Sequence, residues 1–169
     1  MGIQTDGYSA YKNMQTNGKI THLACMAHAR RYFEKALKND KKRAEYALLK
    51  IQGLYAIEQK SREREVGFET RKRYRQLYAK PILSELETWL NKNFDQILPK
   101  SAIGEAIGYS HNLWPRLKAY INDGRYEIDN NLIENAIRPL ALGRKNYLFA
   151  GSHKSAQNAA MMYSFFCNL

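Results

Sequence analysis

The sequence has little cysteine and no long apolar run. Its two cysteines, Cys25 and Cys167, stand far apart, so no disulfide framework is indicated and a reducing cytoplasm is the expected compartment. No apolar stretch approaches the ~18 residues that a membrane-spanning helix needs. The amino-terminal residues are polar and interrupted by glycines, which is not typical of a secretory signal. We therefore expect a cytoplasmic location and no membrane partner.

Acidic residues are scarce relative to basic ones. Lys and Arg number 27 against 16 Asp and Glu, which gives a formal net charge of +11 and a pI of about 9.6. This balance favours a polyanionic partner, and nucleic acid is preferred over a merely solvated basic surface because the positive charges cluster. The apolar fraction of 44% is sufficient for a core, so a disordered tail is excluded.

Hydrophobic periodicity divides the chain into two α/β ends around a helical middle. The pattern predicts an α-rich α/β fold with a large all-helical insertion, whose apolar stripes are expected to be packing core. Residues 1–40 and 124–169 are predicted to form the core domain, and residues 41–123 the insertion. Short strands are predicted near residues 3–6, 20–25 and 146–149.

Helix boundaries are indicated by prolines and by a polar cap. Pro81 suits the first turn of a helix that follows another helix over residues 68–78. Ser101 is a good residue to cap the next helix. Pro115 is expected to end or kink that helix.

Asp6 is the first candidate for chemistry. It follows a short predicted strand, and Gly7 allows the backbone to bend sharply there. Carboxylates at strand ends hold divalent cations in nucleases and phosphoryl-transfer enzymes. The dipeptide alone favours the alternative that Asp6-Gly7 is simply a turn.

The stretch CMAHARRYF combines a thiol, an imidazole and two guanidinium groups at a predicted strand-to-helix junction. Cys25 and His28 have the spacing of half a zinc site, and His22 adds a third candidate. A structural zinc site needs four ligands and no second Cys/His pair is near, so zinc is the minor alternative. Near a helix amino terminus, His28 with Arg30 or Arg31 suits phosphate binding; a satisfied histidine on a basic helix face is the competing interpretation.

The stretch DNNLIENAIRP is acidic and amide-rich. Asn131 and Glu134 fit a capping box, and Glu134 can pair with Arg138 on one helix face, so the stretch alone predicts a helix start. Asn130 and Glu134 also share a face, with Asp129 directly before them. Acids that can bind a metal beside bases that can bind phosphate are the composition a DNA-cutting site needs. The basic and amide residues farther along are Arg138, Arg144, Lys145 and Asn146.

Three segments together resemble the carboxy-terminal half of the insertion-sequence-66 family of bacterial transposases: QTDGYSAY, CMAHARRYF and DGRYEIDNNLIENAIRPLALGRKNYLFAGS. The resemblance spans essentially the whole chain. It implies a DDE enzyme with a ribonuclease-H-like core and two divalent metals, Mg²⁺ or Mn²⁺. It implies that Asp6 is the second catalytic acid, that Glu134 is the third, with Asn131 as the cap, and that the Cys25–His28 pair lies near the scissile strand.

The implied activity is DNA cleavage and strand transfer during transposition. The implied partners are transposon-end and target DNA, with a second copy or a full-length transposase, in the bacterial cytoplasm at the nucleoid. The residues expected to contact DNA are His28, Arg30, Arg31, Asn130, Asn131, Arg138, Arg144, Lys145 and Asn146.

Two departures from the family pattern shape the expectation. Asn135 stands where the family commonly has arginine after the third acid, which removes one phosphate contact. The family's first catalytic Asp is expected upstream of QTDGY, so residues 1–169 alone are expected to be inactive. The alternatives are a non-catalytic DNA-binding or dimerising regulator, a functionless remnant, or an unrelated basic helical protein in which the three motifs coincide by chance.

Overall fold

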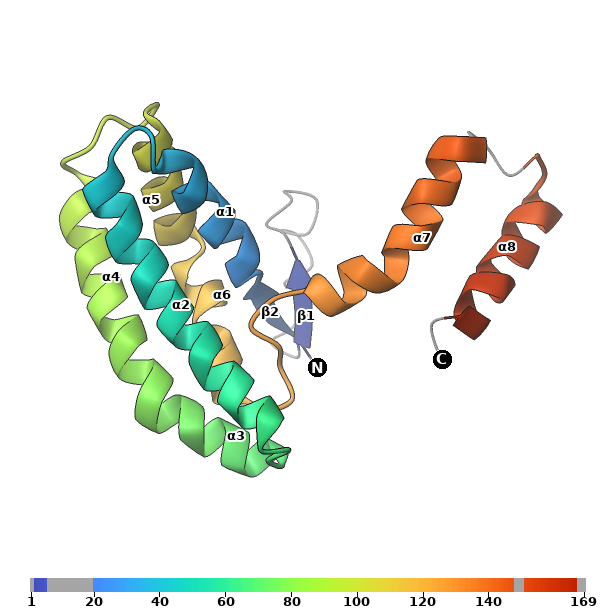
Figure 1. Ribbon diagram of the computed structural model, residues 1–169, viewed down its shortest axis with the longest axis horizontal. Coiled ribbons are helices and arrows are strands. Elements are labelled where there is room, and N and C mark those ends of the chain that lie inside the picture. Colours follow the sequence, from blue (N-terminus) through green and yellow to red (C-terminus); the bar gives the residue numbers. More distant parts are fainter. Residues whose placement is uncertain (1, 6–19, 148–150, 167–169) are drawn as a thin grey trace. The chain divides into compact units, whose positions relative to one another are not determined.

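The computed structural model describes residues 2–5, 20–147 and 151–166, and helices dominate it (Figure 1). The α-rich character predicted from the sequence is therefore confirmed. The chain forms two compact units, Met1–Asn130 and Asn131–Leu169. Across the described residues, no helix is both long enough and apolar enough to cross a membrane. The predicted division into a core domain (residues 1–40 and 124–169) and a helical insertion (residues 41–123) does not coincide with these two units, and it stays a prediction.

A small parallel sheet lies in the first unit. Strands β1 (Gly2–Thr5) and β2 (Thr21–Ala24) pair so that Ile3 lies opposite His22 and Thr5 opposite Ala24. Both strands lie where the sequence predicts them. Because the strands are parallel, their carboxyl ends lie at the same edge of the sheet. The junction between β2 and the first helix lies at this edge.

Helices make up the rest of the first unit. Two begin at polar caps: the Asp40 side chain accepts a hydrogen bond from the Arg43 N–H, and Ser101, as predicted, accepts one from the Gly104 N–H. In chain order the elements are α1 (Met26–Ala36), α2 (Lys41–Glu63), α3 (Phe68–Tyr74), the π-helix η2 (Arg75–Ala79), α4 (Lys80–Phe94), α5 (Ala102–Asn112), α6 (Trp114–Leu117) and the 3₁₀ helix η3 (Ala119–Asn122).

Pro81 lies in the first turn of α4, as predicted, but α3, η2 and α4 follow one another without a break and form one continuous helical run. A proline inside a helix lacks one N–H donor and crowds the carbonyl four residues earlier. Here the preceding turn widens, so that the Lys80 N–H bonds to the Arg75 carbonyl in the π pattern. The π turn absorbs the defect without ending the helix. Pro115 acts as predicted, since α5 ends at Asn112 and α6 begins a new turn around the proline.

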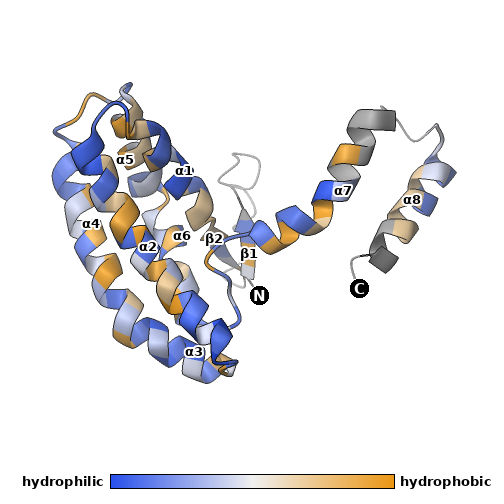
Figure 2. Ribbon diagram, viewed as in Figure 1, coloured by the Kyte–Doolittle hydropathy of each residue, from blue (hydrophilic) through white to orange (hydrophobic). Residues whose placement is uncertain are grey.

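The core of the first unit lies between its helices. Helix α1 packs on α5 and α2, and α4 packs on α5 and α2. Figure 2 shows apolar and hydrophilic residues alternating along these helices, as expected for amphipathic helices with one buried face. Phe94, the last residue of α4, is 39% exposed and stacks on His111. The largest fully buried apolar side chains are Met26, Phe33, Ile51, Leu54, Leu86, Leu90, Ile107, Leu117, Tyr120 and Ile128.

The second unit consists of helices α7 (Asn131–Tyr147) and α8 (His153–Phe166). Pro139 lies inside α7 and does not end it. The strand predicted near residues 146–149 is wrong at 146–147, which are helical, while 148–149 lie outside the described residues. Residues 140–147 contain no β-branched side chain, and their Leu, Ala, Arg and Lys favour helix.

Candidate functional site

Segments from distant parts of the sequence meet beside the small sheet. The Gln4 side chain in β1 donates a hydrogen bond to the Glu127 carbonyl at 3.2 Å, across 123 sequence positions. The Met26 N–H, directly after β2, donates to the Ile128 carbonyl at 3.1 Å. A Cβ atom added to Gly2 would lie 2.5 Å from the Tyr126 ring, so any larger residue here would have to displace that ring. Residues 126–130 therefore run beside both strands before α7 begins.

Cys25 and His28 lie at the junction between β2 and α1, as predicted. Cys25 is fully buried, and His28 lies in the first turn of α1. Burial raises the pKa of the Cys25 thiol and the Asp129 charge adds to this, against the lowering effect of nearby backbone hydrogen bonds. Among the described residues, no group of three His, Cys, Asp or Glu side chains could hold a metal ion. The zinc alternative therefore gains no support from this part of the chain.

The next turn of α1 exposes two guanidinium groups. Arg30 and Arg31 are both exposed, and Arg30 pairs with Glu34 one turn later at 3.1 Å. An exposed i, i+4 pair of this kind contributes little to stability. A phosphate can therefore compete for Arg30 at a small energetic cost.

Asp129 and Asn130 lie at the end of the segment beside the sheet. Asp129 is 8% exposed, and its Oδ2 accepts a hydrogen bond from the Tyr55 hydroxyl of α2 at 2.7 Å. Burial, reinforced by this bond, raises the pKa of Tyr55. The buried Asn130 Oδ1 has no hydrogen-bond partner among the described residues. An amide oxygen that can accept a further bond is thus present at this point.

The predicted catalytic pair is only partly described. Asp6 follows β1 directly and lies outside the described residues. Glu134 lies in the first turn of α7, which begins at Asn131, so the predicted helix start is confirmed. Because α7 belongs to the second unit, the pairing of Asp6 with Glu134 stays a prediction. Arg138, Arg144, Lys145 and Asn146 also belong to α7.

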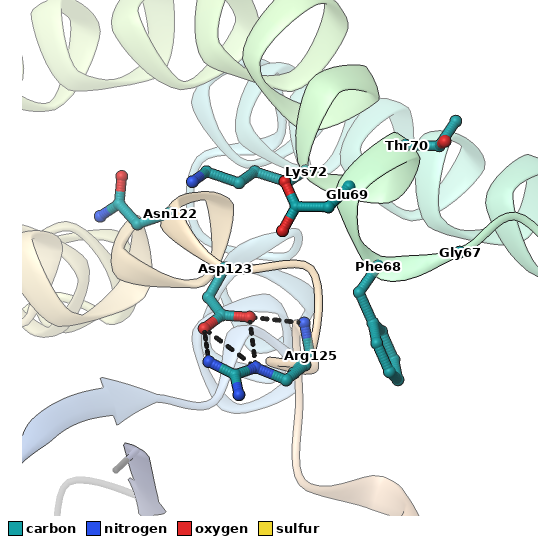
Figure 3. Close-up of a pocket in the computed structure, with 8 residues that line it drawn as sticks. All are labelled: Gly67, Phe68, Glu69, Thr70, Lys72, Asn122, Asp123 and Arg125. Atoms are coloured by element: carbon teal, nitrogen blue, oxygen red, sulfur yellow. Dashed lines mark hydrogen bonds and ion pairs between the residues drawn. The ribbon is translucent and has the colours of Figure 1, made fainter.

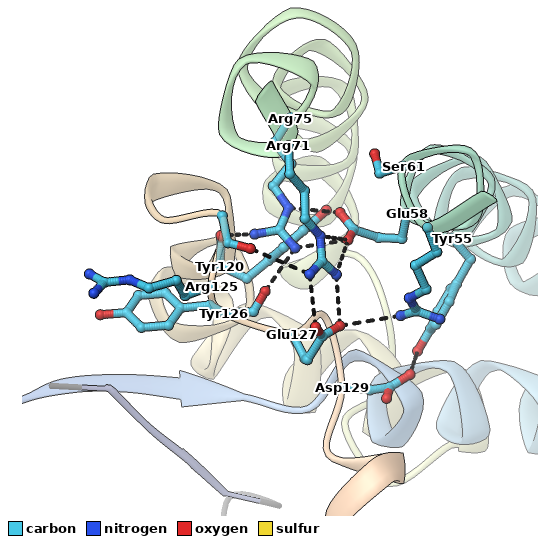
Figure 4. A network of polar contacts seen from close by, with 12 residues as sticks. Tyr55, Glu58, Ser61, Arg71, Arg75, Tyr120, Arg125, Tyr126, Glu127 and Asp129 are labelled. Carbon is cyan, nitrogen blue, oxygen red and sulfur yellow. Dashed lines mark hydrogen bonds and ion pairs between the residues drawn. The ribbon is translucent and has the colours of Figure 1, made fainter. Parts of the chain in front are cut away.

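A buried ionic network, not predicted from the sequence, lies beside this segment (Figure 4). Glu58 of α2 is 1% exposed and accepts hydrogen bonds from Arg75 (Nε and Nη2, both 2.8 Å) and from Arg71 (Nε 3.1 Å, Nη2 2.8 Å). Arg71 also makes a two-pronged pair with Glu127, at 2.8 and 2.7 Å. Although burial opposes it, this pairing keeps the pKa of the Glu127 carboxyl below its usual value.

Arg75 directs the remaining donors of its guanidinium group at the backbone. Its Nη1 bonds to the carbonyls of Tyr120 (2.9 Å) and Asp123 (2.7 Å), and its Nη2 to that of Tyr126 (2.8 Å). The network therefore holds the loop that leads to residues 126–130. The sequence does contain a signal for this network, because Glu58 continues the buried stripe of α2 that contains Ile51 and Leu54. A charged side chain on a buried stripe needs an oppositely charged partner that is also buried.

An open surface cavity of about 650 Å³ lies where the start of α3 faces the same loop (Figure 3). In it Arg125 pairs with Asp123 at 2.6 Å, which lowers the pKa of the Asp123 carboxyl. Gly124 passes so close to α3 that an added Cβ atom would lie 1.9 Å from the Phe68 carbonyl oxygen. None of the residues predicted to act on DNA lines this cavity, so we assign it a structural role in docking the loop.

The first unit is thus an α-rich α/β structure in which a small parallel sheet adjoins the segment that enters α7. Residues 2–158 match the family described as Transposase IS66 family. The chain belongs to this family of transposases, as its three motifs predict.

Curated relatives match most of this chain. Uncharacterized protein y4jD of Sinorhizobium fredii (strain NBRC 101917 / NGR234) is 32% identical over 169 residues, covering 96% of this chain and 33% of the relative. Uncharacterized protein y4qI of the same organism is 33% identical over 158 residues, covering 89% and 29%. Uncharacterized protein y4hP, also from that organism, is 30% identical over 177 residues, covering 95% and 32%. The chain spans about a third of the length of these relatives. No solved structure matches it.

Proposed function

We propose that this chain is the carboxy-terminal catalytic part of a DDE-type transposase with a ribonuclease-H-like core. In this proposal Asp6 and Glu134 are the second and third acidic residues of the site. The supporting observation is the hydrogen bond from Gln4 to the Glu127 carbonyl. It joins the strand that immediately precedes Asp6 to the segment that immediately precedes the helix of Glu134, although some 120 residues separate them in sequence.

The oxygen donors suit Mg²⁺ or Mn²⁺. These hard cations prefer carboxylate and amide oxygens, and Mg²⁺ needs only one or two carboxylates together with substrate phosphate and water. Asp6 and Glu134 would supply the carboxylates, and the buried Asn130 Oδ1, with no hydrogen-bond partner among the described residues, is a further oxygen next to α7. When bound, the cations would activate the attacking hydroxyl and stabilise charge on the scissile phosphate.

The protein's own groups would bind and orient DNA. Arg30 and Arg31 are exposed one turn into α1, where guanidinium groups can hold phosphate oxygens. His28 precedes them at the helix start, and Arg138, Arg144 and Lys145 lie on α7. The formal charge of +11 favours association with the DNA backbone whatever its sequence. Transposon ends and target DNA are the proposed partners, with a second copy or a full-length transposase.

A metal-binding experiment tests the assignment of the two acids. Free Mn²⁺ is measured by electron paramagnetic resonance during titration of the wild type, Asp6→Asn and Glu134→Gln, with Glu85→Gln as the control. Glu85 is a surface acid that pairs with Lys50 across α2 and α4. Each test variant should bind Mn²⁺ at least about tenfold more weakly, since each loses a charged oxygen ligand. Equal affinity in all four proteins would leave both acids structural.

A second candidate, a non-catalytic DNA-binding regulator, is favoured by the net charge alone. Both candidates predict DNA affinity that falls steeply with salt, because lysines and arginines displace condensed counterions. Fluorescence anisotropy with a labelled duplex, from about 50 to 200 mM salt, measures this slope. If DNA affinity falls steeply with salt but Mn²⁺ binding does not depend on Glu134, the regulator is the better description. DNA binding that does not change with salt contradicts both candidates.

A further inference from the structure

The chain entering α7 has no regular secondary structure, yet it is held at several points. Residues 126–130 form neither helix nor strand. An irregular segment of this kind opens easily unless other elements anchor it. The sheet supplies two anchors, the bonds from Gln4 and from the Met26 N–H. The helices of the first unit supply two more.

The first anchor on the helices is Arg75. It is fully buried, and its charge is balanced by Glu58. Its bonds to the carbonyls of Tyr120, Asp123 and Tyr126 fix the backbone where the segment begins. The three carbonyls converge on one guanidinium group, so any movement of this loop away from Arg75 would break charge-assisted hydrogen bonds.

The second anchor is Tyr55, one turn before Glu58 on α2. Its hydroxyl donates to Asp129 Oδ2 at 2.7 Å, and Figure 4 shows the two side chains meeting between α2 and the segment. Asp129 is 8% exposed and the bond is partly buried, so it is stronger than a fully exposed contact. It acts two residues before α7 begins and five before Glu134.

We propose that Tyr55 is a positioning residue, which through Asp129 holds the last residues of the first unit, 126–130, directly before the chain continues into α7. This rests on the proposed function, in which Glu134 is a catalytic acid. Asp129 then acts as a hydrogen-bond acceptor for α2 and not as a metal ligand, although it is the first acid of DNNLIEN. The helices of the first unit accordingly hold this segment and are not a passive spacer.

Tyr55→Phe is the decisive variant, because it removes one oxygen atom and keeps the ring. Tyr46→Phe is the matched control, since Tyr46 lies on the same helix and its ring stacks on Trp89. Amide hydrogen exchange of residues 126–134, followed by mass spectrometry without metal, should be about tenfold or more faster in Tyr55→Phe. Exchange in Tyr46→Phe should match the wild type. Unchanged exchange in Tyr55→Phe would overturn the proposal.

Substitutions of Asp129 distinguish an acceptor from a metal ligand. Asp129→Asn keeps an acceptor oxygen and should restore most of the protection that Asp129→Ala loses. Mn²⁺ affinity should fall in Tyr55→Phe and stay near wild type in Asp129→Asn. The reverse pattern, with Mn²⁺ binding lost only in Asp129→Asn, would make Asp129 a ligand and overturn the positioning role. Wild type without a Mn²⁺ site would refute the proposed function, while the metal-free exchange result would still decide whether Tyr55 anchors the segment.

Discussion

Removing the charge of Glu58 should destabilise the first unit strongly. Glu58→Gln keeps the shape of the side chain, but one carboxylate oxygen becomes an N–H₂ group. Four guanidinium N–H contacts now converge on the two oxygens of Glu58. Whichever way the amide is oriented, its N–H₂ group faces at least one guanidinium N–H of Arg71 or Arg75. Two donors cannot bond to each other. Arg75 would then be buried without a charged partner.

The size of the effect depends on the burial of both partners. Arg75 is 0% exposed and Glu58 1% exposed, so water cannot replace the lost charge. Removing one member of a buried ion pair typically costs about 3–5 kcal/mol. Arg71 keeps its second partner, Glu127, so we expect about 3 kcal/mol, near the lower end of that range. This is a large part of the ~5–15 kcal/mol that stabilises a typical domain.

Urea unfolding provides the measurement. Trp89 and Trp114 are fluorescence probes that pack in or against the core, and the free energy of unfolding comes from the linear dependence on urea. Glu85→Gln is the control, because its pair with Lys50 is at the surface and should contribute less than about 1 kcal/mol. A loss of under about 1 kcal/mol in Glu58→Gln would refute the reasoning that the network depends on buried charge.

Two further predictions use the loop that the network holds. Gly124→Ala should cost about 1–3 kcal/mol of unfolding free energy, because its Cβ would lie 1.9 Å from the Phe68 carbonyl oxygen. Gly108→Ala, in α5 with open space around it, should instead stabilise by up to ~1 kcal/mol; equal effects in urea unfolding would contradict the close approach. Since the pKa of Glu127 is lowered on folding, its contribution is present above about pH 4.5 and lost as the pH falls further. The stability gap between wild type and Glu127→Gln should therefore narrow below pH 4.5, and a constant gap down to about pH 3 would contradict the ion pair with Arg71.

Local pattern was sufficient for much of the fold. The stripe spacing of α2, the capping of α5 by Ser101 and the helix start at Asn131 each depend on residues within a few positions of one another. Local pattern also placed Pro81 correctly in the first turn of α4, but it did not indicate that a π turn joins α4 to the helix before it. It failed at residues 146–147, where aromatic and apolar residues suggested a strand but no β-branched residue supported one.

What the sequence determined by itself is membership of the transposase family, the two strands and the helical character of the middle. These depend on motifs and periodicities that are complete within short windows. Only the tertiary structure decided that Tyr55, Glu58 and Arg75 hold the chain entering α7. The contacts of Tyr55 and Arg75 with that chain join residues 45 to 74 positions apart, and their geometry depends on how α2 and the η2 turn pack, which no local pattern specifies.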